Sequence, residues 1–415
     1  MEALHTMFLD ALHAALLGET VAWREPLEPG QWAALFHMAE EHHILPMIYE
    51  AAVPSEAGKQ ADRALLQPVK QGVIRSVTLQ ALRTQAFFAL YDALCAEGLT
   101  PLVVKGVVCR ELYPKPDHRM SADEDILLPP EQLRACHRAL TARGFRSEAD
   151  EDETARAYET SFFSADGLTH IEVHSSLFPP ESEAYGDLAA LFQDAFAHAE
   201  VRPVAGHPLR TLSHTEHMLF LLCHAFKHFV HSGFGLRQVS DIALYANAHG
   251  DAIDWDAVMR TCRSVRAERF AAALFAIAQA HLTLDPVRAC LPAAWASPDV
   301  DPGPMLQDLL SSGVYGSASM SRRHSSRITL SAVSTSKRGG REHAGVLKAL
   351  FPSAADLEGC YPYLQKRPWL LPAAWAQRIA AYRRETAHGR SNNAADAVRI
   401  GRERTALLRA YDIIS

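Results

Sequence analysis

Apolar residues in the first 97 positions recur with the spacing of a helix. Leu9, Leu12 and Leu16 are separated by three and four positions, so they share one helix face. A longer run with the same period extends from Val73 to Glu97 and is followed by a glycine, a residue typical of helix C-termini. This pattern predicts an N-terminal helical region over residues 1–97.

The pattern changes over residues 98–180, where short apolar segments alternate with an amphipathic one. Leu102–Val104 and Ile126–Leu128 are apolar runs that predict buried strands. Thr169–His174 alternates polar and apolar residues, as a half-buried strand does. Glu131–Arg143 has helical spacing and lies between the second and third strands. The alternation predicts a small α/β core.

Helical spacing returns after this core. It predicts a helical domain over residues 181–300, in which Ser213–Val230 is the strongest helix and begins with a capping serine. Residues 301–345 are rich in serine and arginine and predict a loop. Residues 346–415 predict a C-terminal helical region. The expected fold class is α+β and mostly helical.

Composition excludes several classes of protein. The chain has 41 basic and 48 acidic residues, a net charge of −7, which argues against coating nucleic acid through global charge. No apolar run reaches the ~18 residues of a membrane span, so we expect no membrane partner. Seven cysteines lack the short spacings of a zinc knuckle. This usage predicts reduced thiols and a cytoplasmic location.

Three carboxylates are the strongest candidates for chemistry. Asp123 and Asp125 stand at i and i+2 on entering a strand, so they share a face about 7 Å apart. Glu172 lies on the polar face of the later strand, between His170 and His174. If the two strands are neighbours, the acids converge, and a divalent cation relieves their repulsion. Oxygen ligands favour Mg²⁺ or Mn²⁺ over zinc.

Each of these motifs also has a structural explanation. Asp123 can cap a turn, and Glu172 can be a solvated strand residue. Lys105 and Gly106 follow the first predicted strand, where a glycine lets a phosphate approach the backbone and a lysine adds positive charge. Such junctions also occur between strand and helix without any ligand.

Longer segments resemble a known family. They are Leu-Val-Val-Lys-Gly at 102–106, Arg-x-x-x-Asp-x-Asp-x-Leu-Leu at 119–128 and Ile-Glu-Val-His at 171–174. Together they resemble the uncharacterised bacterial nucleotidyltransferases of the DNA polymerase β-like superfamily. The resemblance continues through Phe226–His228 and into the C-terminal third of the chain, so it spans nearly the whole sequence.

The resemblance implies a small mixed β-sheet at the core and two Mg²⁺ ions that bind with an NTP. Asp123 and Asp125 match the metal-binding pair of the family. Glu172 matches the third acid, which serves the catalytic metal and helps to deprotonate the acceptor. The expected nucleotide-binding residues are Lys105, Gly106, Arg119, Ser121, Lys227, His228, Arg237 and Asp241.

The histidines of the strongest predicted helix allow three interpretations. His224 and His228 stand at i and i+4, a spacing that zinc sites use. They can instead be core or surface residues of the helix. In the third interpretation Lys227, His228 and Arg237 face the nucleotide and bind phosphates, with Asp241 orienting His228 or Arg237.

Two positions depart from the superfamily pattern. The nucleotide-binding turn is usually Gly-Ser or Gly-Gly, whereas this chain has Lys105 and Gly106. The residue between the aspartates is usually apolar, and here it is Glu124. Period-two geometry directs Glu124 to the opposite face, where it needs solvent or a basic partner. On this basis we expect Glu124→Gln to retain activity.

The expected function is Mg²⁺-dependent transfer of a nucleoside monophosphate from an NTP to a small-molecule or peptide acceptor. In the family such reactions would serve natural-product or polysaccharide biosynthesis. One alternative is a catalytically degenerate module that binds a nucleotide or a partner. A further alternative is a nucleotidyltransferase that modifies tRNA or protein, although the net negative charge disfavours a long RNA acceptor.

Overall fold

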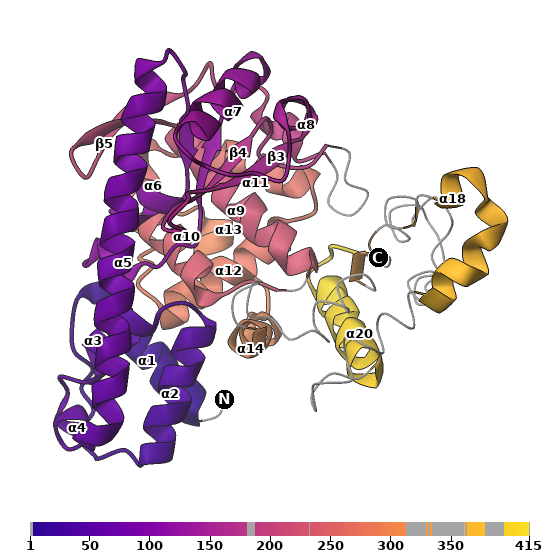
Figure 1. Cartoon of the computed structure of the whole chain (residues 1–415). Helices are drawn as coiled ribbons and strands as arrows, with labels where there is room; N and C mark the ends of the chain where they lie inside the picture. The colour runs from indigo at the N-terminus through magenta and orange to yellow at the C-terminus, as the bar shows by residue number, and fades with distance from the viewer. Residues whose placement is uncertain are drawn as a thin grey trace.

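The computed structural model describes residues 3–180, 187–231, 233–312, 329–330, 333, 361, 363–377 and 394–414. Its N-terminal region is helical, as predicted. The helices are α1 (Ala3–Leu17), α2 (Pro29–Glu41), α3 (Leu45–Ala52), α4 (Glu56–Lys59) and α5 (Arg63–Ala96). Figure 1 shows α5 running from this helical end of the molecule to the sheet.

Helix α5 begins ten residues before the predicted start at Val73. The side chain of Asp62 caps it by accepting a hydrogen bond from the amide of Ala64 at 2.8 Å. With 34 residues it is about 50 Å long. It ends before Gly98, whose φ of 82° is the left-handed conformation expected at a helix C-terminus.

The described residues form one six-stranded mixed sheet. Its strands are β1 (Leu102–Val104), β2 (Glu124–Leu127), β3 (Glu159–Phe163), β4 (His170–His174), β5 (Glu200–Val204) and β6 (His207–Thr211). They lie in the order β3-β4-β2-β1-β6-β5. β2 is parallel to β4 and antiparallel to β1, and β1 is parallel to β6. The predicted α+β, mostly helical class with a small mixed sheet is confirmed.

Two strands of this sheet lie beyond the predicted core of 98–180. The hairpin β5–β6 joins the sheet where Val103 pairs with Thr211, whose hydroxyl donates to the Val103 carbonyl at 2.7 Å. Ala205 and Gly206 turn the hairpin with positive φ values of 49° and 81°. Prolines within both strands weaken the alternation that would have predicted them.

The two faces of the sheet differ in chemistry. One face packs against the second half of α5 and against α7 (Leu133–Ala142), through a cluster that includes Phe87, Leu140 and Ile171. The other face carries the acids of β2 and β4 and is covered by helices that follow the sheet in sequence. A mainly apolar layer therefore supports the sheet from behind the candidate site.

The remaining helices complete the described chain. The α-helices are α6 (Gly106–Arg110), α8 (Glu151–Arg156), α9 (His214–His231), α10 (Leu236–His249), α11 (Trp255–Ser264), α12 (Glu268–His281), α13 (Ala293–Ala296), α14 (Gly303–Ser312), α18 (Tyr363–Lys366) and α20 (Ala394–Ala410). Short 3₁₀ helices are Pro116–His118, Pro130–Gln132, Ala189–Phe192, Gly250–Ala252 and Pro368–Leu370. None of the helices described is long and apolar enough to cross a membrane.

The segment predicted as a loop begins with a helix. α14 occupies its first part, within 301–345, and its Leu309 and Leu310 are buried in the main core. Most of the rest of the Ser/Arg-rich segment lies outside the described residues. At the start of α9 the predicted cap is present, since the Ser213 hydroxyl accepts from the Glu216 amide at 3.3 Å.

Candidate active site

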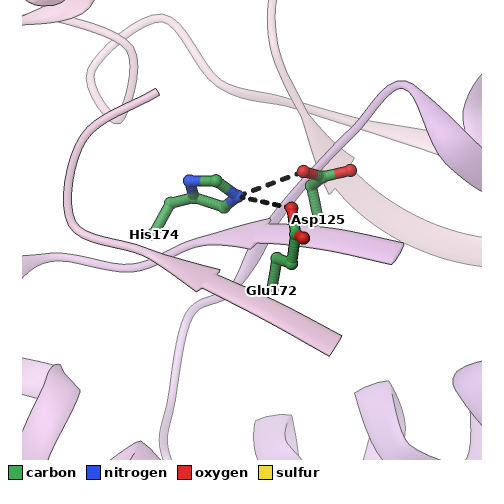
Figure 2. Close-up of side chains that lie close together, drawn as sticks. All are labelled: Asp125, Glu172 and His174. Carbon is green, nitrogen blue, oxygen red and sulfur yellow. Dashed lines mark hydrogen bonds and ion pairs between the residues drawn. The ribbon is translucent and has the colours of Figure 1, made fainter. Parts of the chain in front are cut away.

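Neighbouring strands bring two of the predicted acids together. β2 and β4 run parallel, and Asp125 stands directly opposite Glu172 in their register. Figure 2 shows that both side chains and His174 point toward one another. One ligand atom from each of the three lies within 4.8 Å of the others. His174 Nε2 lies 3.1 Å from Asp125 Oδ1 and 3.8 Å from Glu172 Oε2.

The two carboxyl groups have opposite pKa shifts. Burial raises the pKa of Asp125, but Lys105 and His174 lower it by more than burial raises it. The pKa of Asp125 therefore lies below its ordinary value. Burial, together with the charges of Asp125 and Asp123, raises the pKa of Glu172 to about 8. A buried carboxyl that is difficult to ionise next to one that is already ionised is typical of a site that gains stability from a cation.

The donor set fits a divalent metal ion. It consists of two carboxylates and one imidazole, and the Nδ1 atom of His174 is buried without a hydrogen-bond partner, 4.0 Å from Glu159 Oε2. Because the set includes a nitrogen ligand, it differs from the oxygen-only set expected from sequence, and the imidazole is a better ligand for a transition-metal ion such as Mn²⁺ than for Mg²⁺. Sequence analysis did not assign His174 as a ligand, although its i+2 spacing from Glu172 was the available signal.

Asp123 lies just before β2 and is not part of this cluster. Its charge nevertheless acts on Glu172 and on Lys105. The Ser121 hydroxyl donates to the Asp123 carbonyl at 2.6 Å, and the Ser121 amide donates to Gln80 Oε1 at 2.8 Å. Ser121 therefore shapes the turn that leads into the acids.

Lys105 lies at the centre of the site. Its ammonium is 2.9 Å from Asp125 Oδ2 and 3.4 Å from His224 Nε2. Burial lowers the pKa of Lys105, but Asp125, Asp123 and Glu172 raise it more, so the amine stays protonated. The lysine predicted to bind a triphosphate is thus an ion-pair partner of a candidate metal ligand.

The turn around Gly106 is held by groups of the protein itself. The Val107 amide donates to Glu124 Oε2 at 2.8 Å, and the Lys105 amide donates to His217 Nε2 at 3.2 Å. A Cβ atom on Gly106 would lie 2.0 Å from Glu124 Oε2. The absent side chain therefore makes room for the Glu124 carboxylate. This differs from the expected turn, in which the glycine makes room for a phosphate.

The Glu124 side chain points to the face of the sheet opposite Asp125, and there it pairs with the basic residue Arg110. Its Oε1 accepts from Arg110 Nη2 at 2.5 Å, and both side chains are almost completely buried. The ion pair lies across the sheet from Asp125, because alternate residues of β2 face opposite sides. Glu124 thus holds the turn that carries Lys105, and the expectation that Glu124→Gln is a neutral change does not fit this geometry.

Arg119 and Asp241 are paired with each other. Arg119 Nε and Nη2 donate to the two oxygens of Asp241 at 2.8 and 2.7 Å, and the Tyr113 hydroxyl donates to Asp241 Oδ1 at 2.7 Å. All three groups are buried. Asp241 therefore orients Arg119, whereas the sequence suggested His228 or Arg237. The pair fastens α10 to the segment that precedes the acids.

The basic groups of α9 and α10 lie beside the acids. His224 Nε2 is 3.2 Å from His228 Nε2, and the Gln238 side-chain amide is 3.2 Å from His224 Nδ1. Burial lowers the pKa of both histidines, that of His228 to about 3. Burial also lowers the pKa of Lys227, which the charges of Glu159 and other site acids partly offset.

Two further observations bear on the histidine interpretations. Arg237 donates a hydrogen bond to the Met120 carbonyl, so it too supports the segment before β2. Of the groups that could hold a metal, the described part of the chain contains only the Asp125–Glu172–His174 cluster. The described residues thus offer no zinc site at His224 and His228.

The mixed sheet carries acids on two adjacent strands, as the resemblance to nucleotidyltransferases implies. In agreement, the family described as uncharacterised nucleotidyltransferase matches residues 28–283. The chain belongs to this family. Among solved structures, the antibiotic-resistance factor ANT(2'')-Ia in solution is similar with 15% identity and a TM-score of 0.32, covering 46% of this chain and 94% of that one. No curated protein matches the chain.

Proposed function

We propose that the chain transfers a nucleoside monophosphate from an NTP to a small-molecule or peptide acceptor, with Mg²⁺ or Mn²⁺ as cofactor. The observation that carries this proposal is the cluster of Asp125, Glu172 and His174 on two adjacent strands of a nucleotidyltransferase-family chain. The proposal includes membership of the DNA polymerase β-like superfamily and a cytoplasmic location.

The site residues have distinct roles in this reaction. Asp125, Glu172 and His174 would hold a divalent ion, and Asp123, whose charge acts on Glu172, would contact the ion that accompanies the triphosphate. A bound ion supplies stabilisation of the negative charge that develops on the transferred phosphate. Lys105 adds positive charge beside Asp125.

The acceptor, the NTP and a carboxylate of this chain account for every bond and proton of the reaction. The acceptor hydroxyl oxygen attacks the α-phosphorus, the bond from that phosphorus to the bridging oxygen breaks, and pyrophosphate leaves. Glu172 accepts the hydroxyl proton. Burial and the charges of Asp125 and Asp123 raise the pKa of Glu172, so that in its ionised form it is the stronger base of the two carboxylates. Asp125 is a poor base, because its pKa lies below the ordinary value.

The test uses the full chain with four α-³²P-labelled NTPs, Mg²⁺ or Mn²⁺, and fractions of a cell extract as acceptor source. We expect one NTP to label an acceptor and release pyrophosphate. Asp125→Asn and Glu172→Gln should reduce transfer at least 100-fold. The matched control is Asp152→Asn, because Asp152 is an exposed acid on α8 that pairs with Arg134 and is not part of the cluster. Label transfer that survives in both site variants would contradict the proposal.

A second function has a specific observation in its favour. Lys105 neutralises Asp125, and the turn amides are bonded within the protein, as in a module that binds a nucleotide without turnover. Such a module would gain thermal stability from one NTP but release no pyrophosphate in the same assay. A tRNA- or protein-modifying transferase would instead label macromolecular fractions of the extract.

A further inference from the structure

The backbone of Lys105 has a conformation that favours glycine. Its φ and ψ are 43° and −119°, in a region where a side chain is strained. Residues persist in such conformations when the surrounding structure holds them there, and they concentrate at functional sites. Here Glu124 fixes the following turn through the Val107 amide, and His217 fixes the Lys105 amide.

The strained residue delivers a positive charge to a metal ligand. Lys105 Nζ lies 2.9 Å from Asp125 Oδ2, while the other oxygen of Asp125 lies 3.1 Å from His174. The ion pair is largely shielded from solvent, since the Lys105 side chain is 16% exposed and that of Asp125 is 4% exposed. An ammonium in this position balances the same carboxylate that a divalent ion would bind.

We propose that Lys105 is a built-in counter-ion that competes with the divalent metal for Asp125, so that the metal binds tightly only together with a triphosphate. This inference rests on the proposed function. Two cations on one buried carboxylate repel each other, so the metal displaces the ammonium. In the described part of the chain Lys105 Nζ also lies close to His224, whose imidazole is a weak acceptor compared with an anion. Triphosphate oxygens provide the anion to which the ammonium turns.

Lys227 provides a matched control. It lies on α9, where the charges of Glu172 and Asp125 act on it, as they do on Lys105. In the part of the chain that the structure describes, no carboxylate lies within the 4.0 Å of an ion pair with its ammonium. Lys227→Met therefore removes one positive charge near the site without removing a cation from Asp125.

The first experiment measures Mn²⁺ binding to the nucleotide-free chain by electron paramagnetic resonance at pH 7.5. We expect Lys105→Met and Lys105→Gly to bind Mn²⁺ at least tenfold more tightly than wild type, a difference of about 1.4 kcal/mol. Lys227→Met should change the affinity less than threefold. Lys105→Gly also relieves the positive φ, so it keeps the test valid if Lys105→Met folds poorly.

The second experiment replaces free Mn²⁺ with Mn²⁺–tripolyphosphate, which carries the phosphates common to all NTPs. Wild type should bind this complex at least tenfold more tightly than free Mn²⁺. In Lys105→Met and Lys105→Gly that preference should fall at least tenfold, because binding of metal and of phosphate are no longer coupled through the lysine.

The outcomes separate this inference from the proposed function. If wild type binds Mn²⁺ and the Lys105 variants bind it no more tightly, the inference fails and the metal site stands. If Lys227→Met tightens binding as much as Lys105→Met, general charge explains the effect and the inference also fails. If neither wild type nor any variant binds Mn²⁺, both the inference and the proposed metal site are wrong.

Discussion

Glu124→Gln provides a direct test of the site architecture. The substitution keeps the shape of the side chain and removes its charge. Glu124 accepts from Arg110 at 2.5 Å and from the Val107 amide at 2.8 Å, and its carboxylate fills the space beside Gly106. The variant therefore leaves the Arg110 guanidinium buried without a counter-charge, next to a side-chain amide whose oxygen can accept a hydrogen bond but carries no negative charge.

The expected cost follows from the burial of both partners. Arg110 is 1% exposed and Glu124 is 5% exposed. Removing one partner of such a buried pair typically costs about 3–5 kcal/mol, because the other charge loses its partner and does not regain water. We expect Glu124→Gln to lower the free energy of unfolding by this amount. Activity should also fall, because the turn that positions Lys105 loses its support.

The assay is urea unfolding followed by circular dichroism, with Glu56→Gln as the control. Glu56 and Lys59 form an ion pair of the same 2.5 Å length, but their side chains are 64% and 62% exposed. The control should cost no more than about 1 kcal/mol. The double variant Arg110→Met with Glu124→Gln should recover part of the loss, because it removes the buried charge. A Glu124→Gln variant within 0.5 kcal/mol of wild type would refute this reasoning.

Three further predictions concern the ionisable groups Asp241, His42 and Glu172. Asp241→Asn should lower the free energy of unfolding by about 3 kcal/mol in the same urea assay, because Arg119 keeps its charge without a carboxylate. Burial and the charge of His43 lower the pKa of His42 to about 4, so the chain should lose about 1.4 kcal/mol of stability per pH unit as the pH falls from 6.5 toward 4. Unfolding curves of His42→Gln should lack that part of the slope. Because the pKa of Glu172 is about 8, Mg²⁺ affinity measured by calorimetry should rise about tenfold per pH unit below pH 8 and then level off, and Glu172→Gln should remove this dependence.

The local pattern of apolar and polar residues was sufficient to predict many of the helices and strands. The apolar periodicity of α1 and α9 and the apolar runs of β1 and β2 identify these elements, because each buries one face or both. Alternation in β4 placed Glu172 on a polar face with His174, and the resemblance indicated the family that the comparison confirmed. The strands β3, β5 and β6 were missed, because their alternation is short or interrupted by proline.

The partners of the charged residues could not be predicted in this way. Local spacing shows which side of a strand Glu124 or Asp125 faces, but it contains no information on which cation lies opposite. Arg110 and Lys105 reach these acids only because β1 lies antiparallel to β2 and α6 turns back over their ends. Arg119 likewise meets its carboxylate across 122 residues of sequence.

The sequence by itself thus determined the family of the protein, several of its helices and two of the acids, Asp125 and Glu172, that meet at the candidate site. Only the tertiary structure decided which of these charges bind one another, because a buried charge is stabilised by whichever opposite charge the packed chain places beside it. The consequence is clearest at the turn after β1. Its glycine and lysine resemble a phosphate-binding motif, yet in the folded chain Gly106 accommodates Glu124 and Lys105 binds Asp125.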